Sequence, residues 1–135
     1  MLHVLAYITA KPGMRETVLR EFQANMPAVH AEEGCIEYVP VVDLLAFGPS
    51  QTELGPDTFV AVEKWASPEA LKAYAAAPHM QACTERTANM IETRVIHVLS
   101  LSKILPDESR CDCTAYRSGT RQNLCDIAPA AGALL

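Results

Sequence analysis

Four segments of the chain have the apolar content and the length that are typical of β-strands. Residues 2–9, 35–42, 58–65 and 93–101 are short runs rich in Val, Ile, Leu and aromatic residues. In the first run, Val4 and Ile8 share one face of the strand, while Leu5 and Tyr7 share the other. The pattern therefore predicts four strands, and in the first of them both faces are apolar.

The segment between the first two strands repeats its apolar residues at helical spacing. The stripe consists of Val18, Leu19, Phe22, Met26 and Val29. Pro27 conflicts with this helix, because an internal proline kinks a helix. Gly34 is well placed to cap its C-terminal end.

A second helical region follows the third strand and is divided by a proline. Ser67 is a typical N-cap residue, and Pro68 suits the first helical position because its missing N–H has no partner there. Pro78 ends this short helix, and a second helix is predicted to run from there to about Glu92.

The predicted order of elements is βαββαβ, with two helices in the second helical region. This order is typical of the ferredoxin-like α+β class, in which helices cover one face of a four-stranded antiparallel sheet. We assign residues 1–102 to this domain. Residues 103–135 show no sustained strand or helix periodicity and are predicted to form an irregular C-terminal extension.

The apolar content of both sheet faces predicts a second subunit. A sheet with one wet face should alternate apolar and polar residues. The first strand does not alternate, and the last strand has Val95 and Leu99 on one side with Ile96 and Val98 on the other. Because the helices can cover only one face, we expect the other face to pack against a copy of itself in a homodimer.

Composition and charge exclude several classes of function. The net charge of −5 disfavours nucleic-acid binding, which usually needs a basic patch. No apolar run is long enough to span a membrane, and the N-terminus does not resemble a signal peptide, so we expect a cytoplasmic protein. The spacing of the five cysteines and four histidines predicts no metal site and no disulfide framework.

The third strand carries a candidate carboxylate beside the only tryptophan of the chain. Period-two counting places Phe59, Glu63 and Trp65 on one face of this strand. Burying an unpaired carboxylate is costly, so Glu63 either lines a functional pocket or pairs with an arginine such as Arg94.

His79 follows the helix break at Pro78, and histidine is the usual proton shuttle near neutral pH. The structural alternative is that His79 caps the second helix. Tyr38 and Asp43 lie on either side of Pro40, which implies an edge strand or a bulge. The long loop that follows contains Leu44, Leu45 and Phe47, which suit either a lid over an apolar ligand or a contact with a partner subunit.

Three stretches together resemble the antibiotic biosynthesis monooxygenase (ABM) family over residues 1–101, and its cofactor-independent quinol monooxygenase branch in particular. They are "EEGCIEYVPVVD", "FVAVEKWASPEALKAYAAAPHM" and "TRVIHVLSL". The resemblance implies a dimeric α/β barrel with a pocket between sheet and helices in each subunit. It also implies oxygenation of hydroquinone-like aromatic substrates by O2 without flavin, haem or metal.

The resemblance also suggests roles for individual residues. Many relatives have a histidine where this chain has Tyr74, and a tyrosine with a pKa near 10 is a poor base. We therefore expect His79 to be the base, with Glu63 or Asp43 orienting it or holding a substrate hydroxyl. The expected walls of the substrate pocket are Trp65, Tyr38, Phe59 and Met80, with Tyr74 as a further contact.

Two other functions suit the same fold. One is an enzyme that isomerises or degrades a small signal metabolite. A phosphorylated substrate would need a cationic anchor in the pocket. Haem degradation, which is known in related folds, uses an asparagine on the first strand. Residues 2–9 contain no asparagine. The other is a non-catalytic dimeric binding module for apolar ligands, which would bind them without consuming oxygen.

Overall fold

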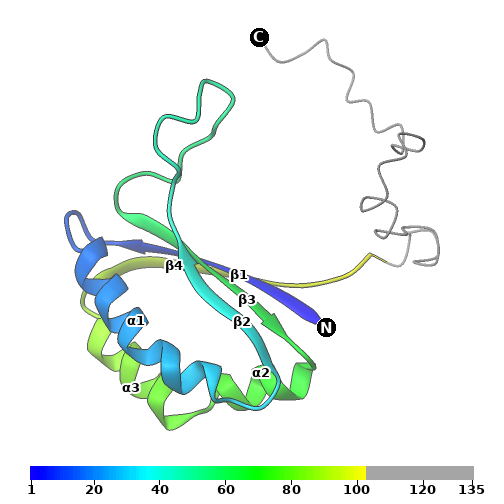
Figure 1. Cartoon of the computed structure of the whole chain (residues 1–135). Coiled ribbons are helices and arrows are strands. Elements are labelled where there is room, and N and C mark those ends of the chain that lie inside the picture. Colours follow the sequence, from blue (N-terminus) through cyan, green and yellow to red (C-terminus); the bar gives the residue numbers. More distant parts are fainter. Residues whose placement is uncertain (103–135) are drawn as a thin grey trace, which may run out of the picture. The chain divides into compact units, whose positions relative to one another are not determined.

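In the computed structural model, which describes residues 1–102, the predicted elements appear in the predicted order (Figure 1). The strands and helices are β1 (Leu2–Ala10), α1 (Arg15–His30), β2 (Cys35–Val41), β3 (Thr58–Trp65), α2 (Pro68–Ala75), α3 (Pro78–Thr87) and β4 (Ile91–Ser100). Residues Met1–Leu101 form one compact unit. The predicted extension at 103–135 lies outside the described residues.

The four strands form one antiparallel sheet in the order β2-β3-β1-β4, which confirms the ferredoxin-like α+β fold. All three helices lie on the same side of this sheet (Figure 1). Pro40 lies in β2, an edge strand, where a missing N–H breaks no central ladder. A register irregularity between Cys35 and Glu37 lies in the same strand.

The start of the second helical region follows local sequence rules. The Ser67 side chain accepts a hydrogen bond from the Ala70 N–H at 3.2 Å, and Pro68 occupies the first helical position. Helix α3 then begins at Pro78 but ends at Thr87, five residues before the predicted end near Glu92. The chain turns there, with Met90 N–H bonded to the Thr87 carbonyl at 2.9 Å, and enters β4 at Ile91.

Two expectations about α1 need correction. Pro27 lies inside α1, in its last turn, and the helix continues through it to His30. Gly34 does not cap this helix, whose C-cap is Ala31. Gly34 has a φ of +82°, and a Cβ there would come within 2.6 Å of the Ala70 Cβ. Glycine is favoured at this position because the turn into β2 is left-handed and because α2 approaches closely.

The helix-facing side of the sheet forms the core. The completely or almost completely buried side chains include Phe59 and Trp65 of β3, Tyr38 of β2 and Val29 of α1. Helix α1 packs mainly on α3 and on β2, which is the edge strand opposite to β4. The helical layer therefore leaves β4 lightly covered, and Ile96 and Val98 are 55% and 54% exposed.

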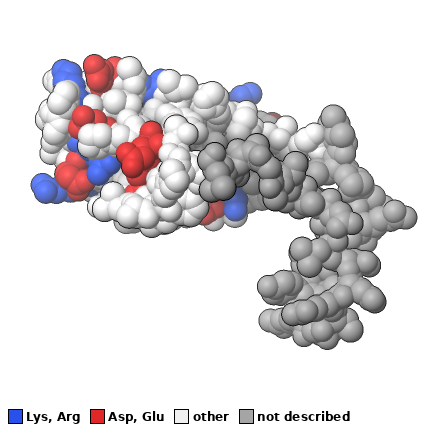
Figure 2. Space-filling view, turned by 90° about the horizontal axis from the view of Figure 1, so that it is seen from above, with Lys and Arg blue, Asp and Glu red and all other residues white. Residues whose placement is uncertain are grey.

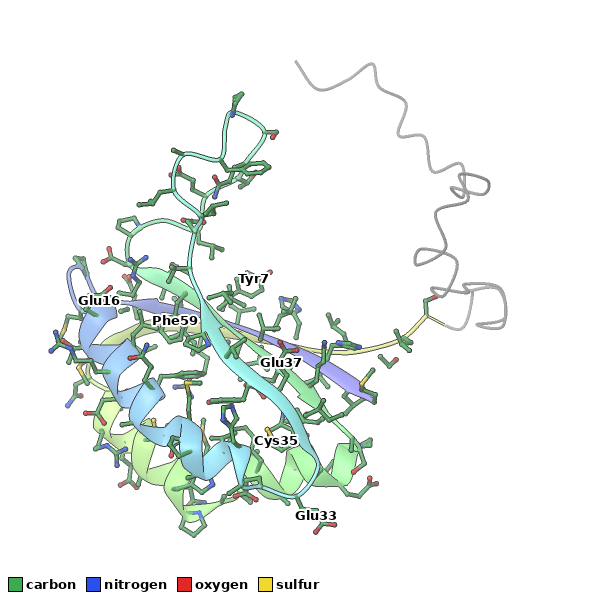
Figure 3. The ribbon with its side chains drawn as sticks, viewed as in Figure 1. Tyr7, Glu16, Glu33, Cys35, Glu37 and Phe59 are labelled. Carbon is green, nitrogen blue, oxygen red and sulfur yellow. The ribbon has the colours of Figure 1, made fainter. Side chains whose placement is uncertain are left out.

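The opposite face of the sheet is mostly apolar, apart from an ion pair between Lys64 and Glu37, and has no covering layer among residues 1–102. Tyr7 lies on this face (Figure 3), and its register partners Val60 and Val95 share it. Leu99 and Val41 on the same face are 44% and 41% exposed. A view from this side shows acidic and basic residues interspersed toward one end of the molecule, with no broad surface of one sign (Figure 2).

The loop between β2 and β3 extends away from the helices (Figure 1). Its apolar residues Leu44, Leu45 and Phe47 are 68%, 87% and 64% exposed. None of them lines the cavity beneath the sheet, so their position does not fit a lid.

Candidate functional site

A cavity of about 590 Å³ lies between the sheet and the helices, as the family resemblance implied. Its lining is mostly apolar and comes from all four strands and all three helices. The strand residues that line it are Val4, Ala6, Ile8, Tyr38, Phe59, Ala61, Glu63, Ile91, Arg94, Ile96 and Val98. Those from the helices include Val18, Phe22, Leu71, Tyr74, Met80 and Cys83.

Strand register explains which side chains face this cavity. Residues directly opposite each other in neighbouring strands point to the same face. Val4 is opposite Glu63 on one side and Val98 on the other, and Ile8 is opposite Arg94. Even-numbered residues of β1 and β4 and the odd-numbered residues of β3 from Phe59 to Glu63 therefore form most of the floor of the cavity.

Glu63 is the buried carboxylate of the cavity. It is 5% exposed, and its Oε2 accepts a hydrogen bond from the Trp65 Nε1–H at 2.9 Å. Among residues 1–102, no group donates to Oε1 and no cation forms an ion pair with this carboxylate. Burial raises the pKa of Glu63, and the hydrogen bond from Trp65 opposes only part of this effect. The result is a carboxyl group that can exchange a proton nearer to neutral pH.

Two tyrosines lie beside this carboxylate. The Tyr74 hydroxyl donates to the Tyr38 hydroxyl at 2.9 Å and lies 3.2 Å from the Met80 Sδ. Burial is the largest cause that raises the pKa of both tyrosines, so both remain protonated at neutral pH. Phenolic O–H groups in this position can donate hydrogen bonds but are poor proton acceptors.

Trp65 supports the site from behind the cavity wall. The indole is completely buried and stacks on the Tyr74 ring with a centroid separation of 4.8 Å. It does not line the cavity, unlike the other predicted wall residues Tyr38, Phe59, Tyr74 and Met80. Its contribution is to hold both Glu63 and Tyr74 in place.

His79 points toward α1 and does not line the cavity. Its Nε2 lies 2.6 Å from the Glu32 Oε1, and its Nδ1 lies 3.2 Å from the Asn25 Oδ1. Both ring nitrogens of His79 are therefore engaged by side chains outside the cavity. This placement does not suit a base acting inside the cavity. His79 is not a capping residue either, since the N-cap of α3 is Ala77.

Asp43 also lies outside the cavity. Its two carboxylate oxygens accept hydrogen bonds from Leu54 N–H and Gly55 N–H, each at 2.9 Å. These contacts close the base of the loop between β2 and β3. Asp43 and His79 are thus not brought together with Glu63, which alone among the three predicted catalytic residues faces the cavity.

The cavity also contains residues that were not predicted as site residues. Phe22 of α1 stacks on Tyr38 with a centroid separation of 4.7 Å. Arg94 lines the cavity from β4 but forms no ion pair with Glu63 among the described residues. Its even-numbered position, shared with Ile96 and Val98, was the sequence signal that could have placed it there.

Residues 1–102 contain neither a membrane-spanning helix nor a cluster of metal ligands. None of the helices there has the length and apolar content needed to cross a membrane. No group of three or more His, Cys, Asp or Glu side chains in this part of the chain is arranged to hold a metal ion.

The comparisons with known proteins agree with the fold. The family model described as "Antibiotic biosynthesis monooxygenase" matches residues 1–86, so the chain belongs to this family. A protein of Escherichia coli (strain K12) named "Probable quinol monooxygenase YgiN" is 39% identical over 101 residues, which cover 73% of this chain and 96% of that protein.

Solved structures show the same architecture. The crystal structure of PA3566 from Pseudomonas aeruginosa superimposes with a TM-score of 0.62 at 25% identity, covering 75% of this chain and 94% of that one. The structure of Rv0793 from Mycobacterium tuberculosis gives a TM-score of 0.62 at 20% identity, covering 78% and 98%.

Proposed function

We propose that this protein is a cofactor-independent monooxygenase that oxidises hydroquinone-like aromatic substrates with O2. The observation that carries the proposal is the cavity, in which a buried carboxyl group with a raised pKa faces an aromatic, mostly apolar chamber. Membership of the monooxygenase family and the name of the E. coli relative support the same reaction class.

The reaction balances without an external reductant. A 1,4-naphthohydroquinone that takes up one O2 gives a hydroxynaphthoquinone and one water. One oxygen atom enters the ring and the other leaves as water, and the substrate itself supplies all four electrons. Deprotonation of a hydroquinone hydroxyl makes the ring a better electron donor to O2, so the protein needs chiefly a base, a binding site and exclusion of water.

We assign the base to Glu63, acting through the Oε1 that no described residue occupies. A carboxyl with a raised pKa is a stronger base than an exposed one, which suits the removal of a phenolic proton. Tyr38 and Tyr74 would orient the substrate oxygen, and Phe59 and Met80 would contact the ring. In this scheme His79 acts as a positioning residue, because it joins α3, which carries Met80, to α1.

The test is oxygen uptake by metal-stripped full-length protein with a panel of hydroquinones, 1,4-naphthohydroquinones included. We expect one O2 consumed for each hydroxyquinone formed, at a rate above the spontaneous oxidation of the substrate. Uptake that yields only the unhydroxylated quinone and peroxide would contradict a monooxygenase. Ligand binding without any oxygen uptake would favour the binding-module alternative.

We also propose that the protein is a homodimer that packs through the face of the sheet opposite the helices, here called the bare face. This face carries Leu5, Tyr7, Val60 and Val95, and an apolar surface of this kind on a stable protein usually marks an interface. A two-fold contact would place the same patch on both sides of the interface. Analytical ultracentrifugation should show a dimer at micromolar concentration, and a monomer alone would contradict the proposal.

A further inference from the structure

The two charged residues that the sheet contributes to the cavity, Glu63 and Arg94, lie far apart. Glu63 is opposite Val4 of β1, whereas Arg94 is opposite Ile8, four residues further along the same strand. Since β3 and β4 flank β1 on opposite sides, the Cα atoms of Glu63 and Arg94 are roughly 16 Å apart. The cavity therefore suits an elongated ligand with a different polar group at each end.

Arg94 is the only cation among the described residues that line the cavity. It forms no hydrogen bond or ion pair with another of residues 1–102. Arg15 and Arg86, by contrast, are held by backbone carbonyls and by Glu21, respectively. The Arg94 side chain is both exposed and part of the cavity lining, so a ligand that enters the cavity can reach it.

The positive charge of Arg94 acts inside the cavity. It lowers the pKa of Tyr74 and of Cys83, although burial is the larger effect and raises the pKa of both groups. The guanidinium thus contributes a positive potential that reaches Tyr74 and Cys83 inside the cavity. A negatively charged part of a ligand would be stabilised next to the guanidinium and disfavoured next to Glu63.

We propose that Arg94 is a specificity-determining residue that binds a carboxylate substituent of the aromatic substrate. The inference rests on the proposed function and deepens it, because the preferred substrates become hydroxylated aromatic acids. A guanidinium matches a carboxylate with two parallel hydrogen bonds. A single cation in a cavity that also contains Glu63 and Glu85 suits a monoanion, whereas a phosphate dianion would need further cations.

The test measures binding and needs no turnover. Isothermal titration calorimetry compares 2-naphthoate with 2-naphthamide, which has nearly the same shape but no charge, on full-length protein. We expect the wild type to bind the carboxylate about tenfold or more tightly, since hydrogen bonds between charged groups contribute about 1.5–3 kcal/mol. Arg94→Gln should bind the two ligands equally, and Arg94→Lys should keep part of the preference.

Arg20→Gln is the matched control, because Arg20 is exposed on α1 and does not line the cavity. This variant should keep the full preference for the carboxylate. Equal affinities in the wild type, a preference that survives in Arg94→Gln, or no binding of either ligand would each overturn the inference. A missing oxygen uptake would refute the monooxygenase but would leave this binding preference standing, so the two failures can be told apart.

Discussion

Two polar clusters lie on either side of the Tyr74 ring, and they differ in whether a proton acceptor remains free. In the first, Glu63 bonds to Trp65 through one carboxylate oxygen and faces the cavity with the other. In the second, both ring nitrogens of His79 are occupied, by Glu32 and by Asn25. Only the first cluster has an unused proton acceptor next to an open space.

In the proposed mechanism, position rather than residue type selects the base. Histidine is the more usual base at neutral pH, but this one joins two helices. A carboxylate is a weak base in water, yet burial raises the pKa of Glu63 and makes it a better one. We therefore expect mutation of Glu63 to lower mainly activity and mutation of His79 to lower mainly stability.

The largest expected effect is that of Glu63→Gln on the rate of oxygen uptake. The amide keeps the size of the side chain but cannot take a proton, so the rate of oxygen uptake should fall by about 10²–10⁴-fold, the usual contribution of a general base. Glu33→Gln is the matched control, because Glu33 is exposed at the end of the domain (Figure 3) and should leave the rate unchanged. Full activity in Glu63→Gln would remove this residue from the mechanism.

His79→Ala should mainly lower stability. The change leaves the half-buried Glu32 and the buried Asn25 without a partner, which costs about 1–3 kcal/mol. Urea unfolding of the single variants and of the His79→Ala/Glu32→Ala pair would measure their coupling. Oxygen uptake that collapses at unchanged stability would restore His79 as the base and break the comparison.

The pH dependence of stability should identify Glu63 independently of activity. With a pKa raised above its ordinary 4.5, the folded protein keeps this proton to a higher pH than the unfolded chain does. Its contribution to stability is complete below the unfolded pKa and is lost as the pH rises through the folded pKa.

Glu63→Gln has no group that titrates here, so its stability does not fall in this way. Between the unfolded and the folded pKa of Glu63, the free energy of unfolding of the variant minus that of the wild type should therefore increase by up to about 1.4 kcal/mol per pH unit. Urea unfolding of both proteins between about pH 4 and pH 8 measures the difference. A difference that does not vary with pH would show that Glu63 ionises normally.

The smallest expected effect is that of Tyr74→Phe on kcat/KM. The ring and its stack on Trp65 remain, and only the hydroxyl that contacts Tyr38 and Met80 is lost. Loss of one hydrogen bond of about 1 kcal/mol should lower kcat/KM by roughly fivefold. Tyr7→Phe, on the bare face of the sheet, is the control and should leave kcat/KM unchanged. Equal losses in both variants would mean that the Tyr74 hydroxyl has no specific role.

Strand residues of the site could be predicted from the sequence because a strand has a fixed period of two. Phe59, Glu63 and Trp65 were placed on one face by counting, and the register confirms that placement. The same parity rule applied to β4 would have placed Arg94 with Ile96 and Val98. The N-cap at Ser67 was equally predictable, because a single local hydrogen bond defines it.

Residues that follow breaks in the chain could not be placed in this way. The chain leaves the helical conformation between Ala75 and Pro78, so the orientation of α3 is set by packing on α1 and not by the periodicity of α2. The direction of His79 depends on that orientation. Asp43 lies where a strand gives way to a loop, and its role depends on backbone groups eleven and twelve residues away.

Trp65 has a practical consequence for every titration suggested above. It is the only indole in the chain, it is shielded from solvent, and its N–H contacts the one carboxyl whose ionisation matters most. Its fluorescence therefore reports a single environment. The intensity and wavelength of its emission should change with the charge on Glu63 and with the binding of an aromatic ligand beside Tyr74. Such measurements need no label attached to the protein.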